Sequence, residues 1–161
     1  MLTGIGIMLL TFVVMEVVAW VMHKYVLHGF LWFLHKSHHT RHNHAFELND
    51  LFFAWYGTLA MLFFIFGSEP LDYRFWIGAG ITLYGVAYFL IHDVFIHRRI
   101  KAFGRTSNVY FKALNMAHRV HHKSSGKDGS ESFGMLWVSP RYFKAASEVV
   151  NKKDKRGAVH H

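Results

Sequence analysis

The chain contains no cysteine among its 161 residues and only two prolines. The absence of cysteine excludes disulfide-stapled folds, cysteine-ligated zinc and iron–sulfur sites, and thiol nucleophiles. Acidic residues are also scarce: 10 Asp and Glu stand against 18 Lys and Arg, which gives a formal net charge of +8. Apolar residues make up 52% of the chain, which excludes intrinsic disorder. A basic excess in so apolar a chain indicates a membrane surface or an acidic protein partner rather than nucleic acid.

Three long apolar runs predict helices that cross a bilayer, since each is near the roughly 20 residues that such a helix requires. They cover about residues 1–22, 51–67 and 75–91. The first run holds one charge, Glu16, which we expect to be protonated, hydrogen-bonded to another helix or close to the membrane surface. A signal peptide is the other interpretation of this run, but it lacks a basic start and a small-residue cleavage site. Shorter apolar stretches at residues 30–34 and 133–138 leave room for a fourth, interfacial or re-entrant element.

The basic residues are distributed unevenly around these runs. Of the 18 Lys and Arg, 14 follow His92, three lie between the first two runs, and only Arg74 lies between the second and third. Because cytoplasmic loops carry the excess of Lys and Arg, residues 23–50 and 92–161 are predicted to be cytoplasmic. We therefore expect an all-α integral membrane bundle of three to four membrane helices with a cytoplasmic helical cap. It would form a single domain over residues 1–161, with a flexible tail from about residue 150 to residue 161.

Ten of the 14 histidines form two spacing patterns, and each pattern occurs twice. His-x4-His and His-x2-His-His alternate along the chain as His23 and His28, then His35, His38 and His39, then His92 and His97, then His118, His121 and His122. On an α-helix, residues three and four apart share a face, so each His-x2-His-His is expected to point three imidazoles one way. Residues five apart are separated by about 140° on an α-helix, so the rings of each His-x4-His are expected to flank a centre rather than to stack.

All four patterns lie at or near the predicted cytoplasmic face, so they can converge without crossing the membrane. Ten imidazoles exceed the roughly four to six ligands of one metal ion, which predicts two neighbouring metal ions in a His-rich site. All-imidazole ligation suits iron, zinc, copper or nickel. Two metals with open positions beside lipid indicate oxygen chemistry on apolar substrates rather than hydrolysis. A metal transport or storage protein is the alternative from another class, and its ligands are expected inside the spans.

The other four histidines lie outside these patterns. His42 and His44 are interpreted as accessory or as solvent-exposed, and solvent exposure is favoured. His160 and His161 follow a charged tail and are interpreted as a frayed terminus or the start of a purification tag.

Three carboxylates near the histidines, Glu47, Asp50 and Asp93, are candidates to accept the second N–H of a metal-bound imidazole. The alternative for each is an interfacial, solvated carboxylate. The chain has no glycine-rich dinucleotide fingerprint and no haem attachment motif, so electrons are expected from outside. The aromatic residues are interpreted as lining for an apolar substrate or as lipid-facing, so no substrate-binding residue is assigned.

The histidine patterns and their surroundings resemble the fatty acid hydroxylase superfamily of membrane di-iron enzymes, and within it the bacterial β-carotene hydroxylases. The stretches that carry the resemblance are residues 15–17 (MEV), 23–29 (HKYVLHG), 32–39 (WFLHKSHH), 46–50 (FELND), 77–80 (IGAG), 84–85 (YG), 92–97 (HDVFIH), 116–122 (MAHRVHH), 126–129 (GKDG) and 132–134 (SFG). The histidines alone indicate the superfamily, and the combined stretches, from about residue 12 to residue 140, indicate the subfamily.

The resemblance implies an O2-dependent monooxygenase that hydroxylates carbon 3 of carotenoid β-ionone rings. It would turn β-carotene through β-cryptoxanthin into zeaxanthin, and would accept related rings, as from canthaxanthin to astaxanthin. The ten patterned histidines would hold two iron ions, for which zinc or another divalent metal can substitute in a preparation, and no further catalytic residue is implied. Reduced ferredoxin would supply electrons, in an inner (cytoplasmic) membrane with the active site on the cytoplasmic side. A carotenoid ketolase or lipid hydroxylase of the same superfamily is the enzyme alternative.

Overall fold

The computed structural model of the chain describes residues 1–40, 46–100, 106–124 and 126–158. Helices are the only extended regular structure in these residues, beside one isolated β-bridge between Ser68 and Leu71, so the all-α prediction is confirmed. In chain order the elements are α1 (Leu2–Val21), η1 (Met22–Phe30), α2 (Trp32–His39), α3 (Asp50–Gly67), α4 (Tyr73–Tyr88), η2 (Phe89–Ile96), α5 (Val109–His121) and α6 (Pro140–Ala158). The two η elements are π-helical, with backbone hydrogen bonds that join residues five apart.

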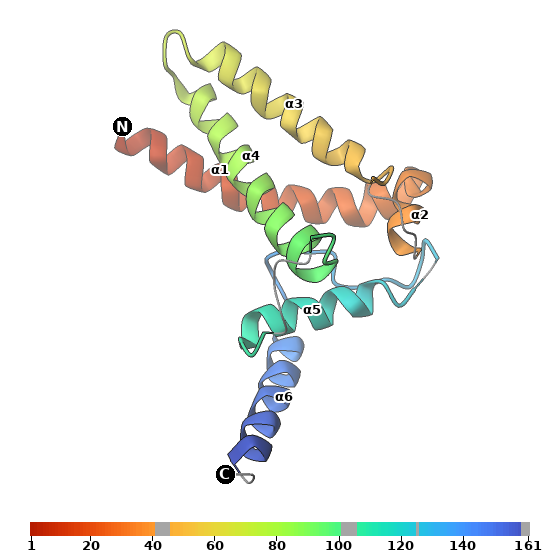
Figure 1. Ribbon diagram of the computed structural model, residues 1–161. Helices are drawn as coiled ribbons and strands as arrows, with labels where there is room; N and C mark the ends of the chain where they lie inside the picture. Colours follow the sequence, from red (N-terminus) through yellow and green to blue (C-terminus); the bar gives the residue numbers. More distant parts are fainter. Residues whose placement is uncertain (41–45, 101–105, 125, 159–161) are drawn as a thin grey trace.

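Three helical stretches of the described residues are long and apolar enough to cross a membrane: Leu2–Phe30, Asp50–Gly67 and Tyr73–Ile96. The first and third extend past the apolar runs because η1 and η2 continue α1 and α4 without a break. Helices α3 and α4 form an antiparallel pair, and α1 crosses α4 (Figure 1). Asp72 begins α4 by accepting the backbone N–H of Arg74 at 2.8 Å, as an N-terminal cap does.

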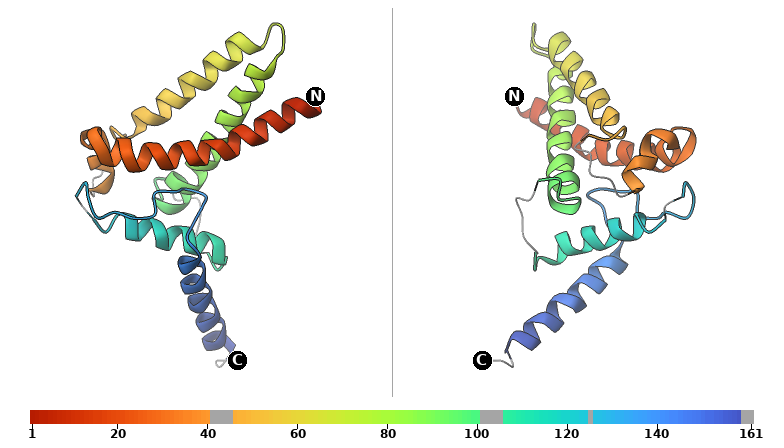
Figure 2. Two further views of the ribbon diagram at one scale, coloured as in Figure 1. Left: turned by 180° about the vertical axis from the view of Figure 1, so that it is seen from behind. Right: turned by 45° about the vertical axis from the view of Figure 1, so that its right-hand side comes forward.

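A cap of short helices lies at the end of the bundle opposite the α3–α4 turn. Figures 1 and 2 show α2 and α5 gathered there, with α6 extending away from the bundle. Asn108 caps α5 by accepting the N–H of Phe111, and Pro140 takes the first position of α6, where its missing N–H is not needed. The core of the cap is small and apolar, and consists of Ala113, Leu114, Ala117, Val138, Tyr142 and Ala146.

The structure describes both stretches that were considered for a fourth membrane element and most of the predicted tail. Neither apolar stretch considered for a fourth membrane element is a long helix: residues 30–34 turn from η1 into α2, and residues 133–138 form an irregular loop. Both stretches are too short to satisfy their backbone groups in lipid, so they fold against the cap. Helix α6 extends into the predicted tail as far as Ala158, because Tyr142 and Ala146 bury one helical face and good helix formers follow. The flexibility of this tail stays a prediction.

Glycines let α4 approach both of its neighbours closely. A Cβ at Gly80 would lie 2.6 Å from the carbonyl oxygen of Met8 and 2.5 Å from Cβ of Thr11, both on α1. A Cβ at Gly78 would lie 3.0 Å from the carbonyl oxygen of Ala60 on α3. Small residues at such crossings let membrane helices pack backbone against backbone. The two glycines therefore set the spacing of the bundle that carries the cap.

We expect Gly80→Ala to lower the midpoint of thermal unfolding in detergent micelles. The added methyl group would force α1 and α4 apart, and overpacking of this kind costs about 1–3 kcal/mol. Gly6→Ala on α1 is the matched control, because a Cβ there would meet no atom within 4 Å. An unchanged midpoint for Gly80→Ala would contradict the close approach of the two helices.

Candidate metal centre

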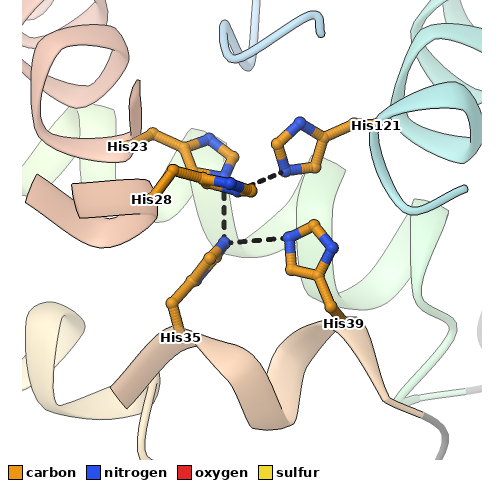
Figure 3. A group of neighbouring side chains, drawn as sticks. All are labelled: His23, His28, His35, His39 and His121. Carbon is orange, nitrogen blue, oxygen red and sulfur yellow. Dashed lines mark hydrogen bonds between the residues drawn. The ribbon is translucent and has the colours of Figure 1, made fainter. Parts of the chain in front are cut away.

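Five imidazoles from three parts of the chain converge in a first group (Figure 3). They belong to His23 and His28 of η1, His35 and His39 of α2, and His121 of α5, and their ligand nitrogens all lie within 4.8 Å of one another. The Nε2–Nε2 distance is 3.1 Å between His23 and His35, 3.2 Å between His39 and His35, and 3.3 Å between His28 and His121. Four of the five side chains are buried, and His23 is partly buried.

Four further imidazoles form a second group beside the first. They belong to His38 of α2, His92 of η2, His97 at the end of η2, and His118 of α5, again with ligand nitrogens within 4.8 Å of one another. The Nε2–Nε2 distance is 3.1 Å between His38 and His92 and 2.8 Å between His97 and His118. Each His-x2-His-His is thus divided between the two groups, where one shared direction was expected.

The tenth patterned histidine, His122, lies between the groups. Its ring centroid is 4.5 Å from that of His39 in the first group and 4.4 Å from that of His118 in the second. Its Nε2 is buried and has no hydrogen-bond partner in the described part of the chain. An unpaired buried imidazole nitrogen is available to bind a metal ion, and His122 is therefore a candidate ligand between the two groups. His42, His44, His160 and His161 lie outside the described residues.

The π-helical turns explain why both His-x4-His pairs fall within one group each. A bond from the N–H of His97 to the carbonyl of His92, at 2.8 Å, joins residues five apart, as a π-helical turn does. The rings of His92 and His97 are 4.5 Å apart between centroids, and those of His23 and His28 are 5.3 Å apart. The rings of each pair do not stack, since their planes are inclined by 63° for His92 and His97 and by 52° for His23 and His28.

Neutral acceptors hold the far nitrogens of the first group. The loop between α5 and α6 supplies four backbone carbonyls that accept Nδ1–H bonds of 2.9–3.0 Å. The donor and acceptor pairs are His23 to Phe133, His28 to Lys127, His39 to Ser124 and His121 to Glu131. The fifth ring, His35, donates to Oδ1 of Asn49 at 2.7 Å. Every ring of this group is therefore fixed in orientation by a partner on the side away from the other rings.

Carboxylates take this role in the second group. His38 donates Nδ1–H to Glu47 at 2.9 Å, and His92 donates Nδ1–H to Asp93 at 2.8 Å. Arg99 pairs with Glu47 at 2.9 Å and approaches Asp93 at 3.8 Å, so one guanidinium supports both carboxylates. These contacts place two of the three predicted carboxylates against imidazoles.

The third predicted carboxylate, Asp50, lies one step further out. It accepts the backbone N–H of Glu47 at 2.9 Å and an N–H of Arg99 at 2.9 Å, and so supports Glu47. Sequence reasoning missed Asn49 and Arg99. Asn49 had a signal, because it is a polar residue between two candidate carboxylates at the start of a span. Arg99 had no such signal, since nothing in the sequence distinguishes it from the other basic residues of the cap.

The Nδ1 contacts fix the position of the ring protons, and the proton positions decide whether the two groups suit metal ions. Carbonyl and carboxylate oxygens only accept, so Nδ1 carries the proton of each neutral ring and Nε2 presents a lone pair. In the pairs His23–His35, His39–His35, His28–His121 and His38–His92, lone pairs therefore face each other at 3.1–3.3 Å with no proton to join them. A cation in each group would turn this repulsion into coordination. The residues fit metal ions well.

Burial disfavours the protonated form of seven of these imidazoles. Desolvation, reinforced by neighbouring rings, lowers the pKa of His35, His97 and His121 to about 3, of His39 to about 4 and of His122 to about 2. The same causes lower the pKa of His38 and His118 well below the ordinary value. Neutral imidazole is the form that binds metal, so these candidate ligands are in the form that binds metal at neutral pH.

An apolar cavity lies between α1, α3 and α4 and reaches the first group. Its volume, the open mouth included, is about 860 Å³. His23 and His35 line it together with side chains that are mostly apolar or aromatic, among them Met15, Ala19, Phe53, Tyr56, Ile81 and Phe133. The cavity therefore joins the membrane part of the bundle to the imidazoles of the cap.

Comparisons with known proteins agree on one family. Residues 8–143 match the fatty acid hydroxylase family. A beta-carotene hydroxylase of Pantoea ananas is 42% identical over 134 residues, which are 83% of this chain and 77% of that protein. A beta-carotene hydroxylase of Paracoccus sp. (strain PC1) is 39% identical over 140 residues, 86% of each chain, and a chloroplastic beta-carotene 3-hydroxylase of Haematococcus lacustris is 41% identical over 135 residues, 76% of this chain and 39% of that protein. No solved structure matches the chain.

Proposed function

The chain belongs to the fatty acid hydroxylase family, and from this premise we propose that it hydroxylates carbon 3 of carotenoid β-ionone rings. The substrates would be β-carotene and β-cryptoxanthin, with zeaxanthin as product, and canthaxanthin could be turned into astaxanthin in the same way. One observation carries the proposal: two groups of facing imidazole lone pairs adjoin each other, and the first of them lines an apolar cavity between membrane helices. The names of the relatives support the same reaction.

We propose that the first and second groups each hold one iron ion, with His122 between them. When bound, iron at such a centre activates O2, so that one oxygen atom enters the C–H bond and the other leaves as water. The reaction consumes a pair of electrons and a pair of protons from outside. Reduced ferredoxin is the proposed electron source, and the basic excess of the cap would attract an acidic donor. Attraction to anionic lipid is a second use of the same charges.

The residues of the chain itself bind, orient and exclude water. The cavity would take the carotenoid ring from the bilayer, because its walls are apolar and it lies between helices that face lipid. The carbonyls of the α5–α6 loop and the Glu47–Arg99–Asp93 cluster would keep the Nε2 atoms of the rings that they contact aimed at the metals. Burial of the imidazoles would keep bulk water from the reacting carbon.

The topology proposed with this function is that of a single domain in the inner membrane. The spans at about residues 1–22, 51–67 and 75–91 would place the cap, and with it the metal centre, on the cytoplasmic side. The distribution of Lys and Arg supports this orientation, since only Arg74 lies in the turn that would be on the far side.

Expression of the chain in a bacterial strain that makes β-carotene tests the proposal. We expect carotenoids with hydroxyl groups at carbon 3, first on one ring and then on both. The purified protein should contain about two iron ions per chain, or another divalent metal in their place. Carotenoids with a keto group at carbon 4 would favour a ketolase of the same family, and unchanged β-carotene with metal bound would favour a metal transport or storage protein.

A further inference from the structure

Glu16 is the one charged residue of α1, and it is fully engaged by donors from outside its own helix. Its Oε1 accepts three consecutive backbone N–H groups, from Met135 at 2.9 Å, Leu136 at 2.8 Å and Trp137 at 2.9 Å. Its Oε2 accepts the hydroxyl of Tyr84 on α4 at 2.8 Å. Of the three explanations that the sequence left open for this charge, the contacts support hydrogen bonding to another helix.

The loop that Glu16 holds is the same loop that orients the first imidazole group. Two residues before Met135, the carbonyl of Phe133 accepts Nδ1–H of His23 at 3.0 Å. Glu16 and His23 are seven residues apart on one continuous helix, so they lie about two turns apart on the same face. The α1–η1 helix thus hydrogen-bonds to the loop at two points, once through Glu16 and once through His23, a candidate metal ligand.

Gly134 shows how tightly the loop closes on Glu16. A Cβ at this position would lie 3.1 Å from Oε1 of Glu16 and 2.9 Å from the carbonyl oxygen of Trp137. Any larger residue would therefore have to push the loop away from the carboxylate. The glycine is required here by a close approach.

Residues of this loop and of its contacts with Glu16 also form a wall of the cavity. Phe133, Met135 and Tyr84 all line it, as do Met15 and Ala19, which flank Glu16 on α1. The ring of Phe133 packs against the candidate ligands as well, with its centroid 5.5 Å from that of His23 and 5.2 Å from that of His121. The place of this wall relative to the imidazoles depends on where Glu16 holds the loop.

We propose that Glu16 is a positioning residue, which sets how the substrate ring stands against the metal centre by fixing the 133–137 loop between cavity and ligands. This inference rests on the proposed carotenoid hydroxylation. Glu16 acts through the loop, and touches neither substrate nor metal. Its loss would move the reacting carbon relative to the centre and leave the ligands in place.

The test compares Glu16→Ala and Glu16→Gln with wild type on β-carotene in detergent, with metal content measured on each preparation. Gln keeps the size and one oxygen for the three N–H groups, so it should restore most of the rate that Ala loses. For Glu16→Ala we expect kcat to fall about tenfold with KM and metal content close to wild type, since partners beyond the ligands cost roughly 10–100-fold. We also expect oxygen to appear at ring carbons other than carbon 3. Val14→Ala, on a lipid-exposed part of α1, is the control.

Gly134→Ala keeps the test decisive if Glu16→Ala does not fold, because it displaces the loop and leaves Glu16 in place. Gly6→Ala, whose added methyl group meets no atom within 4 Å, is its control. The inference would be overturned if folded Glu16→Ala had wild-type kcat and gave products hydroxylated at carbon 3 alone. If Glu16→Ala does not fold, the same result for Gly134→Ala would overturn it. Loss of metal together with activity would overturn it too, because the residue would then be needed for the ligands themselves. Failure of the proposed function is distinguishable, since wild type itself would then give no 3-hydroxycarotenoid.

Discussion

Alanine at either His38 or His121 should abolish carotenoid hydroxylation, with a loss beyond the roughly 10–100-fold that removal of an outer partner costs. His121 is fully buried in the first group, and His38 is buried in the second. Each replacement removes one imidazole from a different group and leaves a neighbouring Nε2 without its counterpart. Because the two groups are held by different partners, we expect each variant to lose mainly the metal of its own group.

Metal analysis of the purified variants, beside pigment analysis of the producing cells, checks this expectation. Phe33→Ala is the matched control, because Phe33 lies on α2 with His38 but is 63% exposed. It should keep wild-type metal content and products. Carotenoid turnover that persists in either histidine variant would rule out a centre that needs both groups.

The second large effect is expected from Gly85→Trp, which fills the cavity. Gly85 lines the cavity on α4, and the nearest atom to a Cβ there would be Cε2 of Phe53 at 3.9 Å, so the indole has room to enter. A displacement of about 1 Å at the reacting carbon can cost on the order of 100-fold in rate, and an indole would displace the ring further. We therefore expect hydroxylation to fall by more than about 100-fold with metal content unchanged.

Gly57→Trp controls for the added bulk. Gly57 lies on α3, a Cβ there would meet no atom within 4 Å, and it is not among the residues that line the cavity. This variant should hydroxylate β-carotene like wild type. A folded, metal-loaded Gly85→Trp with wild-type turnover would show that the substrate ring reaches the centre by another route.

The histidine patterns could be recognised from the sequence because the spacing of the histidines is a property of the sequence itself. The prediction of ten candidate ligands for two metal ions at one end of the bundle follows from position and residue type alone. The division of the ligands did not follow. His35 and His39 join the first group while His38 joins the second, and this depends on which helices stand on either side of α2.

The π-helical turns mark a second limit. Spacing in an α-helix separates His92 and His97 by about 140°, and the π-helical turn that joins them was not predicted. A π-helical turn is strained relative to an α-helical one, so the surrounding packing has to maintain it. Local sequence therefore fixed the helix but not its local winding.

By itself, the sequence determined that the chain is all-helical and apolar enough for three membrane helices, and that ten imidazoles repeat in two patterns near one predicted face. Those properties follow from hydropathy, charge and spacing, which are local. Only the tertiary structure decided that Glu16 hydrogen-bonds to the 133–137 loop, and that four carbonyls of the α5–α6 loop orient imidazoles of the first group. Every residue carries a backbone N–H or carbonyl of the same kind, so no side-chain pattern announces which of them will orient a ligand. Their role exists only once folding has brought distant parts of the chain together.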